Sequence, residues 1–333
     1  MDKVNVAING FGRIGRTLLR ILEKCAWVEI VAINDLTDSK TLAHLFKYDS
    51  VHGIFDGTIS FEEGFLVVNR KKIQVCSEKN PVLLPWKNLA VDVVVESTGH
   101  LLDRKGASGH LTAGAKKVIL SAPSTTPDVK TIVLGVNDSL LKADDLLISN
   151  ASCTTNCAAP MIKLLDDLWT IEDCYVTTVH SYTGDQRLHD APHKDLRRAR
   201  AAAVSIIPTS TGAAKAVTRI FPHLEGKVGG CGIRVPVPNG SITDITCVLS
   251  KPTSVSEIND AFKRAAESNL KGILQYCTDP IVSVDIIGNT HSCILDAEFT
   301  SVVGNMVKVM GWYDNEMGYS CRIADLIQRI SAA

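Results

Sequence analysis

The chain has 333 residues, of which 45% are hydrophobic and 21% are charged, values that are ordinary for a globular protein. This composition excludes disordered, collagen-like and coiled-coil proteins, and the length predicts two domains. The 35 basic and 36 acidic residues leave a net charge of -1, so neither nucleic acid nor an anionic membrane is expected as a primary partner.

The chain opens on a strand-like segment, 1–6, and not on a basic segment followed by a long apolar one, so we expect no secretory signal. No apolar stretch approaches the roughly 18 residues of a membrane span. The ten cysteines are scattered through the sequence. This pattern is typical of reduced thiols and predicts a cytoplasmic location.

The first half of the chain has the pattern of a doubly wound α/β domain. Residues 3–9 and 28–33 resemble buried strands, and 13–24 between them place apolar residues on one helical face. Strand, helix and strand in this order form a βαβ unit with parallel pairing. Further strands are predicted at 91–95, 117–120 and 146–149, and helices at 42–47 and 101–113. We therefore predict a Rossmann-type domain with a parallel sheet over 1–150.

The pattern changes after Ser149. A helix is predicted over 158–169, where Pro160 indicates a kink or a later start. Strands are predicted at 174–180, 232–237, 241–250, 294–300 and 305–313, and helices at 213–220, 255–268 and 319–331. This order is typical of a second, α+β domain, 151–315, with a mainly antiparallel sheet and helices on one face.

A glycine motif follows the first predicted strand and opens the first helix. Gly10 allows a tight turn, Gly12 the close approach of a pyrophosphate, and Gly15 close packing of helix on strand. Asp35 follows about 20 residues later, where an acid can bond ribose hydroxyls and repel a 2′-phosphate. The motif therefore predicts an NAD site in preference to an NADP site. The alternative is a mononucleotide site or a purely structural turn.

Cys153 stands between a predicted strand end and a helix. A helix N-terminus stabilises a thiolate, and the hydroxyls of Ser152 and Thr154 can donate to an anion, so Cys153 is a candidate nucleophile. The alternative is a buried, inert thiol. Cys157 lies one helical turn further, where core packing is favoured over a redox role. No metal site is expected, because no second cysteine pair lies nearby.

His180 ends a β-rich run and leads into a polar loop. An imidazole next to a thiolate is a general base suited to neutral pH. Spacing alone does not pair His180 with Cys153. Arg234 lies in an otherwise apolar strand and needs an anionic partner, either an internal carboxylate or a ligand phosphate.

Two polar segments remain. Thr211 and Gly212 precede a predicted helix and form a candidate anion nest or helix cap. The polar loop over 184–203 is long enough to be functional or an interface. Its basic cluster lacks the interleaved aromatic residues typical of nucleic-acid binding.

Four motifs lie at 7–16, 152–157, 209–215 and 312–319. Together they resemble phosphorylating glyceraldehyde-3-phosphate dehydrogenase, and the resemblance covers essentially the whole chain. The resemblance implies that Cys153 attacks D-glyceraldehyde 3-phosphate as a thiolate and that His180 acts as the base. Inorganic phosphate would then release the thioester as 1,3-bisphosphoglycerate, with NAD as the cofactor.

The resemblance also assigns binding residues. Thr183 and Arg234 match the residues that hold the substrate's own phosphate. The positions that match the site of the attacking phosphate are Ser152, Thr154, Thr211 and Gly212, with Arg198 nearby. Those that match the cofactor site are Gly10, Phe11, Gly12, Arg13, Ile14, Gly15, Asp35, Lys79, Ser121 and Asn315.

Members of this family are homotetramers in which the polar loop lines a neighbour's cofactor site, so the resemblance implies the same assembly here. It also implies a C-terminal helix over 316–333 that returns to the first domain. Asp35 and Pro192 favour NAD, whereas Ala191 resembles relatives that use both NAD and NADP.

Two alternatives to this reaction stay open. One is erythrose-4-phosphate dehydrogenase, a relative that hydrolyses its thioester with water, and the intact residues for the attacking phosphate argue against it. The other is a binding or regulatory protein on the same fold. The complete set of Cys153, His180 and Arg234 argues against a role without catalysis.

Overall fold

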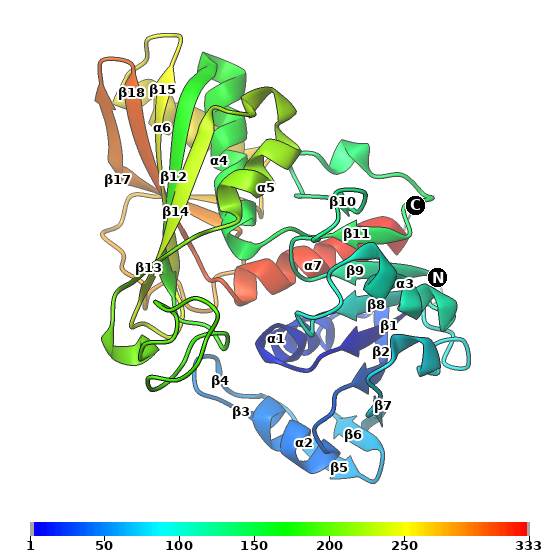
Figure 1. Cartoon of the computed structure of the whole chain (residues 1–333). Coiled ribbons are helices and arrows are strands. Elements are labelled where there is room, and N and C mark those ends of the chain that lie inside the picture. Colours follow the sequence, from blue (N-terminus) through cyan, green and yellow to red (C-terminus); the bar gives the residue numbers. More distant parts are fainter. Residues whose placement is uncertain (1–2, 332–333) are drawn as a thin grey trace. The chain divides into compact units, whose positions relative to one another are not determined.

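The computed structural model describes residues 3–331, which fall into two compact units (Figure 1). The first unit comprises the chain up to Ile132, Ser139–Ala151 and the segment from Ser320. The second comprises Val133–Asp138 and Ser152–Tyr319. Within residues 3–331, no helix is both long and apolar enough to cross a membrane.

A nine-stranded sheet forms the centre of the first unit. Its order is β10 (Lys130–Thr131), β11 (Leu147–Ser149), β9 (Lys117–Leu120), β8 (Val93–Glu96), β1 (Val4–Asn9), β2 (Val28–Asn34), β7 (Lys71–Cys76), β6 (Phe65–Val68) and β5 (Ile59–Glu62). The strands from β10 to β7 pair in parallel, which confirms the predicted doubly wound sheet. The antiparallel strands β5 and β6 were not predicted, because these short, half-exposed segments lack a continuous apolar run.

The helices of the first unit are α1 (Arg13–Leu22), α2 (Ser39–Lys47), α3 (Arg104–Thr112) and most of α7 (Met317–Ser331). A small hairpin follows α2 and is formed by β3 (Tyr48–Asp49) and β4 (Gly53–Ile54). Short 3-10 turns lie at Pro81–Leu83 and Asp138–Leu140. Ala107 of α3 packs with Val94 and Val118 in a buried cluster that joins β8 and β9. Lys117 donates through Nζ to the carbonyl of Ile330 at 3.0 Å, which ties α7 to β9.

The sheet order reverses beside β1. The chain runs from β1 to β2 on one side, whereas β8 lies on the other. Ligands of open α/β sheets bind at such a point, outside the carboxyl ends of the strands. The ends of β1 and β8 therefore mark the place to look for a nucleotide site in this unit.

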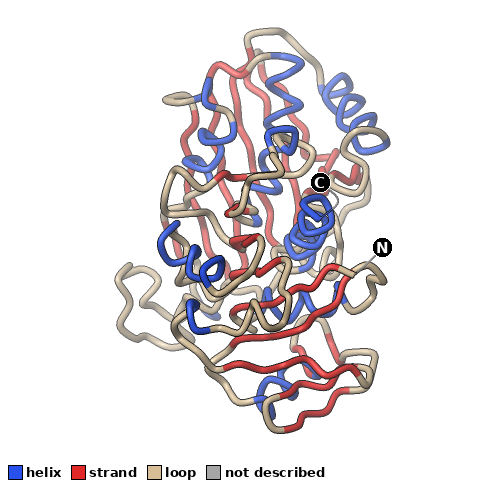
Figure 2. The backbone as a smooth tube through the Cα atoms, turned by 90° about the vertical axis from the view of Figure 1, so that its right-hand side faces the viewer, coloured by secondary structure: helices blue, strands red, loops and turns tan. Residues whose placement is uncertain are grey.

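The second unit is built on a seven-stranded sheet, whose long strands lie side by side in Figure 2. Its order is β13 (Ile207–Thr209), β14 (Val228–Val235), β12 (Ile171–Ser181), β15 (Ser241–Leu249), β18 (Met306–Tyr313), β17 (Cys293–Val303) and β16 (Leu274–Cys277). Only β12 with β14 and β16 with β17 pair in parallel. The remaining neighbours are antiparallel, as predicted for the second half of the chain.

Three helices cover one face of this sheet, α4 (Cys153–Trp169), α5 (Ala213–Ile220) and α6 (Val255–Glu267), and 3-10 turns lie at Ala202–Val204 and Pro222–Leu224. Helix α4 packs on the central strands and contacts both α5 and α6. It begins at Cys153, so the later start predicted from Pro160 is wrong. The side chain of Ser152 caps the helix by accepting from the amide of Thr155, and this bond fixes the earlier start.

Candidate active site

The glycine turn in the first unit has the shape that a dinucleotide requires. Gly10 has a φ of +92°, and a Cβ there would lie 2.6 Å from the amide nitrogen of Thr98. A Cβ on Gly15 would collide with the carbonyl oxygen of Gly10, whereas one on Gly12 would meet nothing within 4 Å. Helix α1 begins at this turn with no side-chain cap. The turn therefore leaves open space and uncapped N–H groups where a phosphate group would lie.

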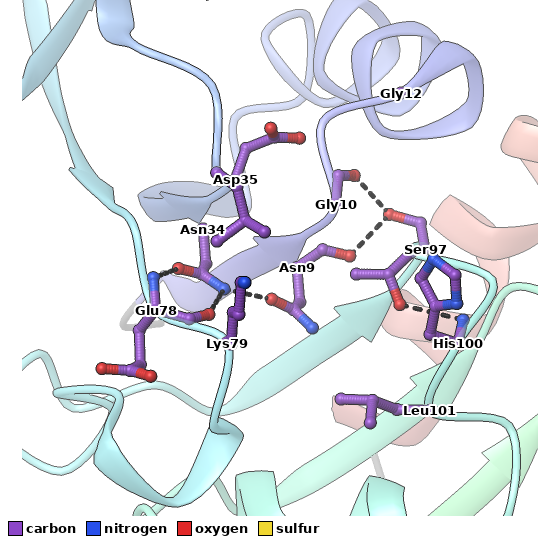
Figure 3. A pocket seen from close by; sticks show the side chains of 12 residues that line it. Asn9, Gly10, Gly12, Asn34, Asp35, Glu78, Lys79, Ser97, His100 and Leu101 are labelled. Carbon is purple, nitrogen blue, oxygen red and sulfur yellow. Dashed lines mark hydrogen bonds between the residues drawn. The ribbon is translucent and has the colours of Figure 1, made fainter.

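A pocket of about 520 Å³ opens beside this turn at the ends of β1, β2 and β8 (Figure 3). It is lined by Asn9, Gly10, Gly12, Asn34, Asp35, Leu36, Glu78, Lys79, Ser97, Thr98, His100 and Leu101. Asp35 accepts through Oδ2 from the amide of Phe11 at 2.8 Å, which holds the carboxylate beside the glycine turn. The cavity, the turn and the acid fit a dinucleotide.

Other predicted cofactor residues lie outside the lining of this pocket. Arg13 is paired with Asp49, and Ile14 is half-buried in α1. Ser121 follows β9 and donates its amide to the carbonyl of Glu96 at 2.9 Å. Asn315 belongs to the second unit, where its Oδ1 accepts from the hydroxyls of two buried serines, Ser181 and Ser241.

The second unit brings Cys153 and His180 together. Cys153 is the first residue of α4, and His180 lies near the end of β12. The distance from Cys153 Sγ to His180 Nε2 is 3.4 Å. Sequence spacing could not pair these two residues, because they are brought together only where α4 packs across the sheet.

The other ring nitrogen of His180 lies against a cation. His180 and Arg234 are register partners on the parallel strands β12 and β14. The guanidinium nitrogen Nη1 of Arg234 lies 2.5 Å from His180 Nδ1 and donates to the carbonyl oxygen of Ser181 at 2.9 Å. The rings of His180 and Tyr313 also form an edge-to-face pair, with 5.9 Å between their centroids. The imidazole is therefore held on three sides.

Burial sets the titration of the pair. Burial raises the pKa of Cys153 to about 11, although the charge of Arg234 and the amide of Thr154 act in the opposite direction. Burial, and then the charge of Arg234, lowers the pKa of His180 to about 3. Between these two values the resting pair is therefore a protonated thiol beside a neutral imidazole.

A second cationic side chain joins this group through a carboxylate that the sequence analysis missed. Asp185 accepts from the hydroxyl of Thr183, and its Oδ2 accepts from Arg198 Nη1 at 2.6 Å. Although burial alone would raise the pKa of Asp185, the bond from Thr183 and the charges of Arg234 and Arg198 keep it below its usual value. The carboxylate of Asp185 thus supplies the negative charge beside one hydroxyl and two guanidinium groups, which are the kinds of group that bind phosphate.

The hydroxyls near Cys153 are already engaged. Thr154 is buried, and its Oγ1 lies 2.9 Å from the phenol oxygen of Tyr313, which also bonds Thr178. Ser152 caps α4. To donate to an anion as predicted, Thr154 must share its hydroxyl with Tyr313. Ser152 must donate while its oxygen still accepts the bond that caps α4.

Thr211 and Gly212 precede α5, as predicted from the sequence. Gly212 is the N-cap residue of α5, which agrees with the predicted cap position, and a glycine brings no side chain of its own to the cap. Arg198 donates from Nε to Thr209 in the preceding strand at 2.9 Å, which brings the loop beside β13.

Cys157 is fully buried one turn below Cys153 and donates to the carbonyl of Gly311 at 3.4 Å. A Cβ on Gly311 would collide with Cys293 and Met161, so this region is tightly packed. This environment confirms the expectation that Cys157 belongs to the core.

Comparisons with known proteins agree with these sites. The family model "Glyceraldehyde 3-phosphate dehydrogenase, NAD binding domain" matches residues 4–104, and "Glyceraldehyde 3-phosphate dehydrogenase, C-terminal domain" matches 152–315. Curated relatives named glyceraldehyde-3-phosphate dehydrogenase include that of Mycobacterium avium, 55% identical with 97% of each chain covered. Those of Priestia megaterium and Geobacillus stearothermophilus are 54% and 55% identical, covering 99% of this chain and 98% of theirs. The chain therefore belongs to the glyceraldehyde-3-phosphate dehydrogenase family and is an NAD-dependent oxidoreductase.

Proposed function

We propose that this enzyme oxidises D-glyceraldehyde 3-phosphate and phosphorylates the product with inorganic phosphate, giving 1,3-bisphosphoglycerate. The observation that carries the proposal is the thiol–imidazole pair, with Cys153 Sγ at 3.4 Å from His180 Nε2 and Arg234 against the opposite ring nitrogen. A cysteine activated by an adjacent base is suited to covalent catalysis on a carbonyl carbon.

His180 moves the proton in each step of this reaction. It takes the proton from Cys153 as sulfur bonds to the aldehyde carbon, and returns it to the carbonyl oxygen to complete the thiohemiacetal. The NAD site of the first unit would supply the hydride acceptor for that carbon when it is loaded. His180 takes the hydroxyl proton at the same stage, and Cys153 is left as a thioester. An oxygen of inorganic phosphate then attacks the acyl carbon, and the sulfur leaves and recovers its proton from His180.

The cations of the second unit account for the two phosphate groups in this proposal. In the proposed reaction Arg234 and Thr183 bind the phosphate of the substrate. The attacking phosphate would be bound by Arg198 together with Ser152, Thr154, Thr211 and Gly212. Each phosphate would compete with Asp185 for its present donors, Thr183 and Arg198. Displacing one carboxylate frees a hydroxyl and a guanidinium together.

NADH formation from D-glyceraldehyde 3-phosphate and NAD, with and without inorganic phosphate, tests this function. We expect sustained turnover only with phosphate, and a single stoichiometric burst without it. Sustained turnover that is independent of phosphate would show hydrolysis of the thioester and would favour the erythrose-4-phosphate reaction. No NADH in either case would overturn the proposal.

Asp35 is proposed to select NAD over NADP. In Asp35→Ala we expect the ratio of kcat/KM for NAD to that for NADP to fall by about tenfold or more, because the carboxylate that opposes a 2′-phosphate is gone. The matched control is Asp38→Asn, which removes a nearby exposed charge and preserves the side-chain acceptor that caps α2. An unchanged ratio in Asp35→Ala would mean that Asp35 does not contact the ribose.

The raised pKa of Cys153 predicts the pH profile of its reactivity. In the NAD-free protein, the rate of alkylation of Cys153 by iodoacetamide should rise by about tenfold per pH unit up to about pH 11, because only the thiolate reacts and burial raises the pKa of this thiol to about 11. A thiol with an ordinary pKa would instead reach a plateau in rate near about pH 9. Such a plateau would contradict the raised pKa.

We also propose a homotetramer and a cytoplasmic location. Four large apolar side chains of the polar loop and its continuation are strongly exposed in the single chain, namely Leu188, Leu196, Val204 and Ile206. Exposed apolar side chains gathered in one segment support an interface there. The ten cysteines are free thiols, which supports a reducing compartment.

A further inference from the structure

Three polar residues form a row beneath the nucleotide pocket of the first unit. Asn34, Asn9 and Glu96 are register partners at the carboxyl ends of the adjacent strands β2, β1 and β8. All three are buried, and Glu96 is completely inaccessible. Asn9 and Asn34 line the pocket (Figure 3), whereas Glu96 is not among its lining residues. A buried row of this kind must satisfy its hydrogen bonds internally.

The direction of the hydrogen bonds from one end of the row is fixed by a backbone amide. The amide of Glu78 donates to Asn34 Oδ1 at 2.9 Å, so Asn34 Nδ2 is left to donate to Asn9 Oδ1 at 2.6 Å. Asn9 Nδ2 must then donate onward, and it does so to Glu96 Oε2 at 2.5 Å. Because an amide N–H cannot reverse its role, every bond in this series points toward Glu96.

The direction from the other end is fixed by an indole. Trp86 Nε1 donates to His110 Nδ1 at 3.0 Å, and an indole N–H is a donor only. His110 therefore carries its proton on Nε2, which lies 3.1 Å from Glu96 Oε2. Both Trp86 and His110 are completely buried. This second series also ends on Glu96.

Glu96 also holds the loop that follows β8. Its Oε1 accepts from the amide of Thr98 at 2.8 Å and from the Thr98 hydroxyl at 2.5 Å. Thr98 is the residue that presses against Gly10 at the glycine turn. Four donors thus converge on the two oxygens of one carboxyl group, which provides an acceptor for each of them.

From this convergence we propose that Glu96 is a positioning residue for NAD, held by His110 and acting through Asn9 and Thr98. Glu96 fixes two residues that line the pocket, Asn9 and Thr98, relative to the glycine turn, and it does not line the pocket itself. The inference rests on the NAD site proposed above. It adds a buried set, Glu96, His110 and Trp86, which supports the pocket from behind.

A glutamine at position 96 cannot reproduce this arrangement. With its NH₂ toward Thr98, it would face the Thr98 amide, which cannot turn into an acceptor. With its NH₂ toward Asn9, it would face the donors of Asn9 and His110, whose orientations are set by Glu78 and Trp86. Either orientation leaves a buried donor opposed by another donor.

The test is NAD binding by calorimetry to the full-length protein, without aldehyde, in wild type and Glu96→Gln. We expect Glu96→Gln to bind NAD about tenfold more weakly or worse. KM for NAD should rise, while kcat and KM for the aldehyde stay near wild type. His110→Phe keeps a ring in place but removes one donor, so its affinity should fall in the same direction and by less.

The matched control is Asp296→Asn, which neutralises a buried carboxylate of the second unit that accepts from the indole of Trp312 at 3.0 Å. This variant should lose thermal stability and keep its affinity for NAD. Alkylation of Cys153 should be unchanged in Glu96→Gln, which separates this inference from the proposed reaction.

Wild-type affinity in a folded Glu96→Gln protein, with only a lower Tm, would overturn the proposal and leave Glu96 a purely structural residue. If Glu96→Gln does not fold, His110→Phe decides, and unchanged NAD affinity in that variant overturns the proposal equally.

Discussion

Cys153→Ser should lower turnover on the order of 10⁴-fold or more while NAD binding stays at the wild-type level. A serine hydroxyl at the start of α4 is a far weaker nucleophile than the thiol, and His180 at 3.4 Å does not make up the difference. The measurements are the initial rate of NADH formation and calorimetric titration with NAD. The NAD pocket is lined by residues of the first unit, so the substitution leaves it intact.

The control for this variant is Cys231→Ser, which changes another partly exposed cysteine of the second unit, on β14. It should retain most of the activity. The burst of NADH in the absence of phosphate should also disappear in Cys153→Ser and persist in Cys231→Ser. Retained turnover or a retained burst in Cys153→Ser would remove Cys153 from the mechanism.

His180→Asn should lower turnover by about 10²–10⁴-fold, the range that a positioned general base contributes. Asparagine keeps a polar side chain beside Arg234 but cannot accept the proton of Cys153. The measurement is the initial rate of NADH formation at saturating NAD and aldehyde.

A buried histidine elsewhere offers the control for this substitution. His110→Phe changes a residue of the first unit and should keep kcat near wild type at saturating NAD. If His180→Asn retains full turnover, His180 is not the base.

The sequence predicted the parts of the site that are local. The glycine turn is such a part, because the positive φ of Gly10 and the close approach of Gly15 arise within one strand–turn–helix segment. The placement of Cys153 at a helix N-terminus is another. The start of α4 was placed too late, because the cap formed by Ser152 outweighs the preference of Pro160 for the first turn.

The residues that sequence analysis missed gain their role from partners that the fold brings to them. Asp185 is one more acid in a polar loop beside its neighbour Thr183, and its role appears only when the loop brings Arg198 to the same carboxylate. Glu96 ends an apolar strand, Val93–Glu96, and a carboxylate there is a signal that could have been used. Two of its donors come from Thr98 in the next loop, but the other two come from Asn9 on β1 and His110 on α3, so their convergence could not be identified from the sequence.

What the sequence by itself determined is therefore the fold class, the nucleotide motif and the residue types of the reaction, since these depend on periodicity and on neighbours along the chain. Only the tertiary structure decided which of them meet. The parallel register of β12 and β14 sets His180 opposite Arg234, and the packing of α4 on the sheet brings Cys153 to the imidazole. Burial in that packed interior, and not the local sequence, then sets the pKa values of the pair, because desolvation depends on everything that surrounds a group.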